Sequence, residues 1–488
     1  MKMYIGGKWI EGHSESRIKK FAPATGRLIY EFSAASKDDV DSAIRAAYEA
    51  FDSWGALTSV ERSRYIFKAK ELIERNRREL EQIIMKENGK IKKEVIEEVD
   101  GVIDQLQYYA EYARKLTGDI VEGTTHTRRI FQYLLPYGVV VAITPWNFPA
   151  AMVARKLAPA LLTGNTVVLK PSSDTPGSAE WIIKKFEEAG VPKGVLNFVV
   201  GKGSEIGDYI VAHKEVSLVT MTGSTSTGQR IMQQASSNMA KLILELGGKA
   251  PFMVWKDADI ENALKALLWA KYWNAGQSCI AAERLYVHED IFNIFIKKFA
   301  ALSNRIRLGN PTNADMAPLI NSDALKNVKA LAQEAELRGG KEVVESKLDM
   351  GGQFANGYFM KPSIIIGADQ KSALFQDEVF GPLIGAMPVS DKEELFKLAN
   401  DSKYGLASYL FTKDLSLVQE ASERIRFGEL YINMSGPEAS QGYHTGFRMT
   451  GQAGEGSKYG IAEYLKRKNV YTDYSGRVAL PTFRKDLK

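Results

Sequence analysis

Short runs of β-branched and aliphatic residues alternate with helical segments in two long series, and this alternation limits the possible folds more than any other feature. The first series has such runs at 138–143, 166–170, 195–200, 217–221 and 242–244. This order predicts a parallel sheet with helices on both faces, because each connection must cross back over the sheet. The loops at the carboxyl ends of these strands are expected to form a ligand-binding crevice.

The second series begins after Gly247-Gly248-Lys249. It contains an apolar run at 252–255, a helical pattern over about 259–273 and a strand-like run at 284–288. With 488 residues, the chain also exceeds the roughly 100–200 residues that one domain usually has. We therefore predict an α/β protein of at least two domains, the second of which spans about residues 248–430.

Other segments lie outside both series. Residues 4–10 are typical of two short strands around a Gly-Gly turn. Helical spacing then predicts helices over about residues 40–51, 60–87 and 93–115. Residues 122–137 and the tail after Val470 resemble strands that have no sheet in either series. We expect these two segments to pair with each other and then with a neighbouring subunit.

Charge and composition exclude several partners. The formal net charge is only +5 at pH 7, and acids are interleaved with bases, so we expect solvated helix faces and no nucleic-acid partner. No signal peptide and no run of about 18 apolar residues is found, so we expect no membrane partner and a cytoplasmic location. Cys279 is the single cysteine and the five histidines are scattered, so we expect no disulfide within the chain and no metal.

Two glycine-rich turns follow strands of the first series. One is Gly201–Gly207, whose spacing differs from the common dinucleotide-binding pattern, and the other is Met221–Gly228. Free backbone N–H groups at the start of a helix favour an anion such as a pyrophosphate. A tight structural turn and a Ser- or Thr-rich helix cap explain the same residues equally well. The turns alone leave both readings open.

The loop Asn274-Ala275-Gly276-Gln277-Ser278-Cys279 ends in the only thiol. A lone cysteine is most often an inert, buried, small apolar residue. The glycine and polar neighbours favour an accessible loop instead, and an accessible thiol can act as a nucleophile if another group removes its proton.

Taken together, these segments resemble the aldehyde dehydrogenase superfamily over almost the whole chain. The matching stretches are Thr144–Pro149, Gly164–Pro171, Thr222–Ser224, Leu244–Lys249, Asn274–Cys279 and Glu378–Pro382. The resemblance implies a Rossmann-like NAD(P)-binding domain (1–121 and 138–247) and a catalytic domain (248–430). It further implies a β oligomerisation arm (122–137 and 471–488), a returning segment that lines the substrate pocket (431–470), and a homodimer or homotetramer.

The same resemblance assigns the catalytic residues. Cys279 matches the nucleophile that attacks an aldehyde, and Asn147 matches the amide that stabilises the oxyanion. Glu245 matches the general base that directs water onto the thioester and that can also take the proton of the thiol. Burial at the end of an apolar strand would raise the pKa of this carboxyl.

Cofactor binding is implied for a further set of residues. Lys170 matches the lysine that bonds the adenosine ribose, and Glu378 matches the acid that bonds the nicotinamide ribose. The other implied cofactor contacts are Thr144, Pro145, Trp146, Ser172, Ser173, Gly203, Gly207, Thr222, Gly223, Ser224, Leu246 and Phe380. Relatives that prefer NAD often have a glutamate where this chain has Ser173, and a carboxylate there would repel a 2′-phosphate. We therefore predict NADP as the preferred cofactor, with NAD possible.

The region after Glu438 departs from the common family pattern and resembles the lactaldehyde and glycolaldehyde dehydrogenase branch. There, the residues that match Arg155 and His444 lie at the substrate pocket beside the oxyanion asparagine. Polar groups suit a short hydroxyaldehyde, so we expect glyceraldehyde or lactaldehyde as the substrate. A surface ion pair for Arg155 and a solvated His444 are the plain alternatives. Succinate semialdehyde, betaine aldehyde, an acylating reaction with coenzyme A and a catalytically silent binding protein also stay open.

Overall fold

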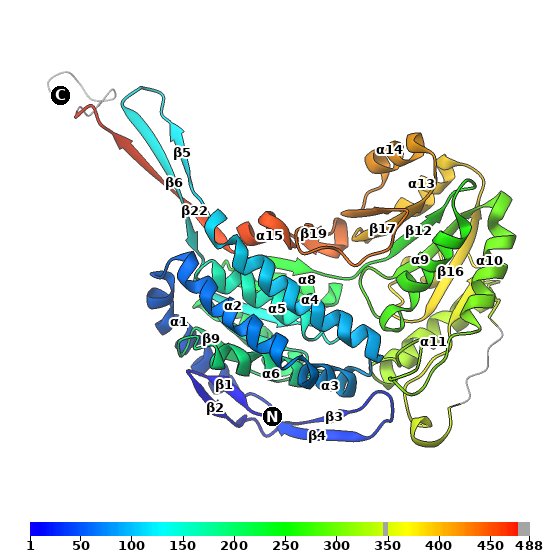
Figure 1. The fold of residues 1–488 in the computed structure, drawn as a ribbon, viewed down its shortest axis with the longest axis horizontal. Coiled ribbons are helices and arrows are strands. Elements are labelled where there is room, and N and C mark those ends of the chain that lie inside the picture. The colour runs from blue at the N-terminus through cyan, green and yellow to red at the C-terminus, as the bar shows by residue number, and fades with distance from the viewer. Residues whose placement is uncertain (345–349, 477–488) are drawn as a thin grey trace.

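The computed structural model describes residues 1–344 and 350–476, so the predicted tail segment 477–488 lies outside the described residues. Two α/β units lie side by side, and a long β-arm extends from the first of them (Figure 1). The predicted α/β class is confirmed. Within the described ranges, no helix has the length and apolar character needed to span a membrane.

The first sheet has eight strands in the order β2-β1-β9-β8-β7-β10-β11-β20. Its five central strands, β9 to β11 in this order, are parallel. The strands are β1 (Met3–Ile5), β2 (Lys8–Ile10), β7 (Val139–Thr144), β8 (Thr166–Pro171), β9 (Leu196–Phe198), β10 (Val216–Thr222), β11 (Lys241–Glu245) and β20 (Gly451–Gln452). Strands β1 and β20, which flank the five parallel strands, are antiparallel to them, because neither joins them through a crossover helix.

Helices cover this sheet. They are α1 (Lys37–Gly55), α2 (Ser59–Arg75), α3 (Arg77–Asn88), α4 (Lys92–Glu111), α5 (Ala151–Leu162), α6 (Pro176–Glu188), α7 (Asp208–Ala212), α8 (Thr225–Ala235) and α15 (Ser457–Glu463). The start of α1 is fixed by a capping box, in which the Ser36 side chain accepts from Asp39 N and the Asp39 carboxylate accepts from Ser36 N. The helical patterns expected near 40–51, 60–87 and 93–115 therefore correspond to α1, to α2 with α3, and to α4.

The second sheet has seven strands in the order β14-β15-β16-β13-β12-β17-β18. They are β12 (Ala250–Val254), β13 (Ala282–His288), β14 (Lys341–Glu342), β15 (Ser363–Ile366), β16 (Leu383–Val389), β17 (Ala407–Phe411) and β18 (Glu429–Ile432). The helices around them are α9 (Ile260–Tyr272), α10 (Glu289–Ser303), α11 (Ser322–Leu337), α12 (Ala373–Gln376), α13 (Lys392–Asn400) and α14 (Leu415–Arg424). Six strands of this sheet run parallel to one another, namely β15, β16, β13, β12, β17 and β18.

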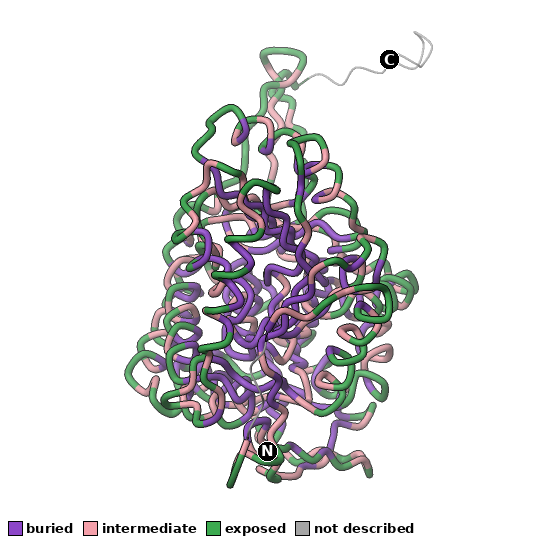
Figure 2. Tube along the Cα trace, turned by 90° about the vertical axis from the view of Figure 1, so that its right-hand side faces the viewer, coloured by how far each residue is buried: buried purple, intermediate pink, exposed green. Residues whose placement is uncertain are grey.

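Each sheet has its own hydrophobic core. One core runs from Met3 to Leu246 and also takes in Ile461 and Tyr464, and the other extends from Ala250 to Phe427. Figure 2 shows the buried segments concentrated inside the body of the molecule, with exposed segments around them. The change from one core to the other occurs between Leu246 and Ala250, at the glycine pair that separates the two series.

The arm is a three-stranded antiparallel sheet of β5 (Asp119–Glu122), β6 (Arg128–Pro136) and β22 (Leu465–Asp473). The predicted pairing of the two outlying segments is present in the described part, from Leu465↔Pro136 to Asp473↔Arg128. The arm is longer than the predicted bounds, 122–137 and 471–488, because β22 already begins at Leu465 and β5 at Asp119. Backbone pairing continues through exposed polar positions that give no apolar signal in the sequence.

Two small hairpins complete the described fold. Strands β3 (Arg17–Phe21) and β4 (Leu28–Ser33) form one near the N-terminus. Strands β19 (His444–Thr445) and β21 (Gly454–Glu455) form the other, which lies in the segment that returns from the second sheet to the first. This second hairpin brings His444 and Glu455 to the junction between the two α/β units, where both line a pocket.

Candidate active site

The order of the first sheet creates a crevice at the carboxyl ends of its strands. The chain enters at β7, adds β8 and β9 on one side, and then places β10 and β11 on the other side. The connections therefore diverge above β7 and β10, and ligands of open α/β sheets bind at such a point. The residues predicted to contact the cofactor from this sheet lie in the last residues of β7, β8 and β10 or in the loops after β7, β8, β9, β10 and β11.

Lys170, at the end of β8, is buried without a charged partner among the described residues. Its ammonium group has one long contact, 3.5 Å from the carbonyl oxygen of Pro171. Burial lowers the pKa of Lys170 to about 8. An isolated buried ammonium is costly unless an anion or a hydroxyl group joins it, so this position fits a ribose or a phosphate. Ser172 and Ser173 follow at the same edge and are partly exposed.

The two glycine-rich turns differ in their local roles. A Cβ atom added at Gly203 or Gly207 would meet nothing within 4 Å, so packing within the chain leaves open space there. At the second turn, Ser224 caps α8, and its hydroxyl oxygen accepts from Thr227 N at 3.3 Å. Ser224 thus forms the helix cap that the sequence allowed, whereas the first turn has open space for a bound group.

Glu378 approaches the crevice from the second unit. One of its carboxylate oxygens accepts from Gly248 N at 2.8 Å, and a Cβ atom at Gly247 would lie 2.7 Å from the other. Burial raises the pKa of Glu378 to about 8. Phe380 has a positive φ of 52° and places its ring edge on Trp146, with 5.4 Å between the ring centroids. Cofactor candidates from both units therefore meet at one crevice.

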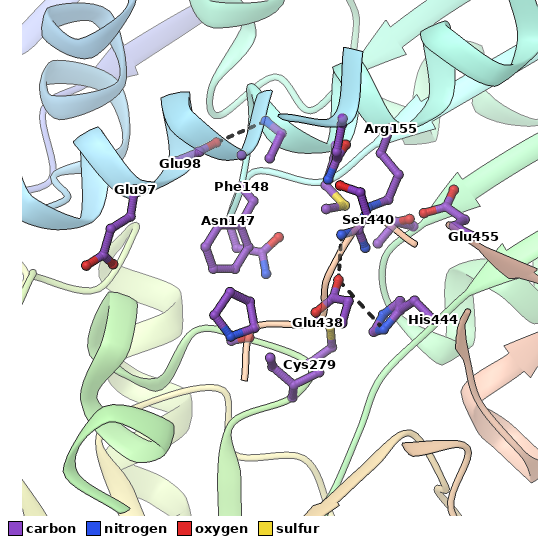
Figure 3. A pocket seen from close by; sticks show the side chains of 18 of the residues that line it. Glu97, Glu98, Asn147, Phe148, Arg155, Cys279, Glu438, Ser440, His444 and Glu455 are labelled. Atoms are coloured by element: carbon purple, nitrogen blue, oxygen red, sulfur yellow. Dashed lines mark hydrogen bonds and ion pairs between the residues drawn. The ribbon is translucent and has the colours of Figure 1, made fainter. Parts of the chain in front are cut away.

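A pocket of about 290 Å³ lies between the two units and contains every predicted catalytic and substrate residue. Figure 3 shows the side chains of Asn147, Cys279, Arg155 and His444 pointing into it. Phe148, Trp269 and Trp273 supply its aromatic wall. Cys279 is half-buried at the pocket surface, so its thiol is accessible, as the sequence predicted.

The loop that carries Cys279 is held by a dense set of hydrogen bonds. Asn274 and Ala275 have left-handed φ values of 51° and 56°, which turn the chain sharply after α9. The Asn274 amide donates to Asn147 O and to Gln277 O, at 3.1 Å each. The Asn147 amide also donates to Gln277 O at 3.1 Å, which leaves its second N–H for another acceptor. Asn147 and the cysteine loop are therefore fixed relative to each other.

Glu245 ends β11 and faces the same pocket. Its side chain is 3% exposed, and neither carboxylate oxygen has a hydrogen-bond partner among the described residues. Burial raises the pKa of Glu245 to about 8, and the nearby His444 opposes part of this rise. Such a carboxylate is a stronger base than a solvated one, so it suits proton abstraction from water near neutral pH.

Arg155 and His444 lie in the pocket wall. Arg155 does not form a surface ion pair and His444 is not solvated, which were the alternatives to a pocket position. The Arg155 side chain is 11% exposed, and its guanidinium is paired with Glu438, also a pocket residue. His444 is 4% exposed, and its Nδ1 lies 2.8 Å from the Glu429 carboxylate. The alternative of a solvated His444 therefore does not hold, because the β19–β21 hairpin packs the side chain between the two units, in the pocket where it was predicted.

Sequence reasoning missed a group of buried charges next to the catalytic loops. Glu94 accepts from Asn274 N at 2.7 Å, and Glu98 accepts from Ala150 N and Ala151 N at the start of α5, just after Asn147. Lys90 pairs with Glu98 at 2.5 Å, and both side chains are fully buried. The four-residue spacing of Lys90, Glu94 and Glu98 is the signal that could have found this group.

Comparisons with known proteins agree with this geometry. A model of the "Aldehyde dehydrogenase family" matches residues 9–470. The chain is 69% identical over 488 residues to D-glyceraldehyde dehydrogenase (NADP(+)) of Thermoplasma acidophilum, with 100% of this chain and 99% of that protein covered. It is 64% identical over 489 residues to the enzyme of the same name from Picrophilus torridus, with coverages of 100% and 99%.

A solved structure shows the same arrangement. Lactaldehyde dehydrogenase from Escherichia coli superposes with a TM-score of 0.94 at 37% identity, over 96% of this chain and 98% of that one. The resemblance inferred from the motifs, including its lactaldehyde and glyceraldehyde dehydrogenase branch, is confirmed by these matches. The chain therefore belongs to the aldehyde dehydrogenase family.

Proposed function

We propose that this protein oxidises glyceraldehyde or lactaldehyde to the corresponding carboxylic acid, with NADP as the hydride acceptor. The observation that carries this proposal is the placement of the Cys279 thiol in one pocket with Glu245 and Asn147, beside the crevice of the first sheet. The high identity to two proteins named D-glyceraldehyde dehydrogenase (NADP(+)) supports glyceraldehyde as the first choice.

Cys279 starts the proposed reaction. Its thiolate attacks the aldehyde carbon, so a carbon–sulfur bond forms and the carbonyl oxygen becomes an oxyanion. The backbone N–H of Cys279 and the second amide N–H of Asn147 would stabilise this charge. The nicotinamide group, when bound, accepts the hydride of the former aldehyde carbon, which leaves a thioester on Cys279.

Glu245 completes the reaction by hydrolysing the thioester. It accepts a proton from a water molecule whose oxygen attacks the thioester carbon. The carbon–sulfur bond then breaks, the sulfur leaves as a thiolate, and the acid is released. The absence of described hydrogen-bond partners at both Glu245 oxygens supports this role, because an oxygen already engaged with a donor is a weaker base.

The residues of the crevice fit a dinucleotide phosphate. Lys170 would hold the adenosine ribose, and its ammonium would also balance a 2′-phosphate beside Ser173, where a carboxylate would repel it. Glu378 would hold the nicotinamide ribose. The other predicted cofactor contacts would line the space between these two ends. This arrangement supports NADP over NAD.

The charges at the pocket mouth favour an uncharged substrate. Glu97 and Asp104 are exposed residues of the pocket rim, and neither has a cationic partner among the residues that the structure describes. The Arg155 guanidinium inside is already paired with Glu438. An anionic aldehyde such as succinate semialdehyde would thus meet negative charge at the rim and an arginine that is already paired. A short hydroxyaldehyde avoids this repulsion and can bond the polar wall.

A matrix of substrates and cofactors tests the proposal. Purified protein is assayed for kcat/KM with glyceraldehyde, lactaldehyde, glycolaldehyde, succinate semialdehyde and betaine aldehyde, each with NADP and NAD. We expect the highest values for glyceraldehyde or lactaldehyde with NADP. A preference for succinate semialdehyde or betaine aldehyde would reject the substrate assignment, and a coenzyme A requirement would reject hydrolysis by Glu245.

We also infer a homo-oligomer in the cytoplasm, built through the arm. Strands β5, β6 and β22 expose apolar side chains, among them Ile120 at 69% and Tyr471 at 74%. Exposed apolar side chains on an extended sheet favour pairing with another copy. Sedimentation analysis of the full chain tests this inference, and a monomer at micromolar concentration would reject it.

A further inference from the structure

His444 lies next to Glu429, Glu245 and Cys279, a grouping that the sequence did not predict. Its Nδ1 atom lies 2.8 Å from Glu429 Oε1, at the start of β18. Its Nε2 atom lies 3.8 Å from Glu245 Oε2 on the pocket side. The imidazole and the Cys279 thiol line the same pocket, and each affects the pKa of the other. Because Glu429 already engages Nδ1, Nε2 is the ring nitrogen that is free to receive the proton of the thiol.

The surroundings of this imidazole favour its protonated form. Glu429, Glu438 and Glu245 approach it from three elements, with Glu438 Oε1 at 3.8 Å from Nδ1. The nearest basic pocket residue, Arg155, is paired with Glu438. Burial lowers the pKa of His444, but Glu429 and Glu438 outweigh it and hold the pKa well above its ordinary value.

We propose that His444 takes the proton of Cys279 and holds the sulfur as a thiolate beside an imidazolium, while Glu429 positions the ring. This inference rests on the proposed role of Cys279 as the nucleophile. The S–H bond breaks and an Nε2–H bond forms, so the pair stays neutral overall. When the thioester is later hydrolysed, the sulfur leaves as a thiolate and the ion pair is restored without a further proton. Glu245 is then reserved for the water molecule.

The surroundings of Glu245 support this division of labour. Glu245 Oε2 lies 3.8 Å from Nε2 of His444, beyond hydrogen-bond distance, so the two groups can act on different protons. The burial of Cys279 raises the pKa of the thiol, and His444 counteracts this rise through a hydrogen bond and its charge. An adjacent cation is the usual means of keeping a buried sulfur nucleophilic.

The rate of Cys279 alkylation by iodoacetamide, followed against pH, tests the pair without any turnover. Cys279 is the only cysteine, so incorporation into the intact protein reports this sulfur alone. His444→Asn should move the apparent pKa of alkylation upward by about 1–3 units, because an opposite charge nearby is lost. Glu429→Gln should move it in the same direction by less, because His444 keeps Glu438 and Glu245 as neighbours. An unchanged profile in His444→Asn would overturn the proposal.

Two controls separate this role from others. His13→Asn removes an imidazole that is also paired with a carboxylate, Asp39, but that lies outside the pocket, and it should leave the alkylation profile unchanged. If His444 only bonded a substrate hydroxyl group, His444→Asn would raise KM and leave the profile in place, which contradicts the ion pair. Should His444→Asn fail to fold, Glu429→Gln alone must show the upward shift.

Glu245→Gln distinguishes the two bases. We expect its alkylation profile to move by less than that of His444→Asn, and a first turnover of NADPH formation to persist. A larger shift in Glu245→Gln would assign the thiol proton to Glu245 and reject His444. A separate experiment tests Cys279 as the nucleophile, because continued oxidation by Cys279→Ala would refute that role. An unshifted alkylation profile in His444→Asn would refute only the ion pair.

Discussion

Glu98 and Glu245 both line the substrate pocket and are both buried, but their surroundings are opposite. Glu98 pairs with Lys90 at 2.5 Å and accepts two backbone N–H groups at the start of α5. Glu245 has no hydrogen-bond partner in the described part of the chain. A carboxylate saturated with donors fixes a structure, whereas a bare one keeps its basicity. We propose that the protein uses the first kind to hold the loops around the pocket and the second as the general base.

The largest effect is expected at the sulfur of Cys279, which lines the same pocket as these two carboxylates. Cys279→Ala removes the nucleophile, so oxidation of glyceraldehyde should fall by more than about 1,000-fold. Cofactor binding should persist, because the predicted cofactor contacts lie elsewhere in the crevice. NADPH formation and a cofactor titration by fluorescence measure the two properties, and residual activity near the wild-type level would refute the role of Cys279.

The bare carboxylate should be needed for deacylation. Glu245→Gln should slow turnover by about 100- to 10,000-fold, since a general base is lost. In the wild type, turnover limited by hydrolysis should rise with pH through about 8, because only the ionised Glu245 accepts a proton. The variant should lose this rise. Steady-state rates between pH 6 and 9.5 test both expectations, and an unaltered pH profile would assign the base elsewhere.

Stability should separate the two carboxylates most clearly. Glu98→Gln leaves Lys90 buried without its partner, so the free energy of unfolding should fall by about 3–5 kcal/mol. Glu245→Gln should instead stabilise the protein at pH 8. The pKa of Glu245 is about 8 in the folded state and 4.5 in the unfolded state. The unfolded chain therefore loses this proton at a lower pH than the folded chain, and the free energy of unfolding falls as the pH rises from about 4.5 to about 8. Denaturant unfolding at pH 5 and 8 measures this, and equal losses in both variants would contradict the comparison.

Cofactor choice should depend on a single uncharged position. Ser173→Glu places a carboxylate three residues after Lys170, so the ratio of kcat/KM for NADP to that for NAD should fall by about 10- to 100-fold through charge repulsion. Ser173→Gln adds a side chain of the same length at the same position without charge and serves as the control. An unchanged ratio in Ser173→Glu would discredit the assignment of this residue.

The smallest effect is expected at the exposed rim. Glu97→Gln combined with Asp104→Asn should raise kcat/KM for succinate semialdehyde a few-fold and leave glyceraldehyde unchanged, because exposed charges act weakly through solvent. The gain should shrink at high salt. Glu111→Gln, about two turns beyond Asp104 at the end of α4 and outside the pocket, is the matched control. A similar gain for glyceraldehyde would point to a change in pocket shape and not in charge.

The sequence predicted much of this architecture, since periodicity and order carry it. The strands of both series appear where β-branched runs predicted them, and the motifs that follow β7, β8, β10 and β11 converge because parallel strands end at one edge. The pairing of 122–137 with the C-terminal strand was also predicted, although β22 begins six residues earlier than expected.

Contacts between distant segments could not be predicted in the same way. Glu94 reaches Asn274 across 180 residues, and Glu429 reaches His444 only because β18 and the β19–β21 hairpin pack together. Helical spacing marks Glu94 and Glu98 as one face, but it does not indicate whether that face is buried. For this reason the lone His444 was ambiguous in the sequence, while its position among three carboxylates is definite in the fold.

Trapping the acyl-enzyme tests the central claim most directly. Glu245→Gln is mixed with glyceraldehyde and NADP, quenched in acid within seconds, and examined by intact-protein and peptide mass spectrometry. We predict one glyceroyl group per chain on the peptide that contains Cys279, formed together with one equivalent of NADPH. NADPH formation without such an adduct, or an adduct on any other peptide, would contradict the account.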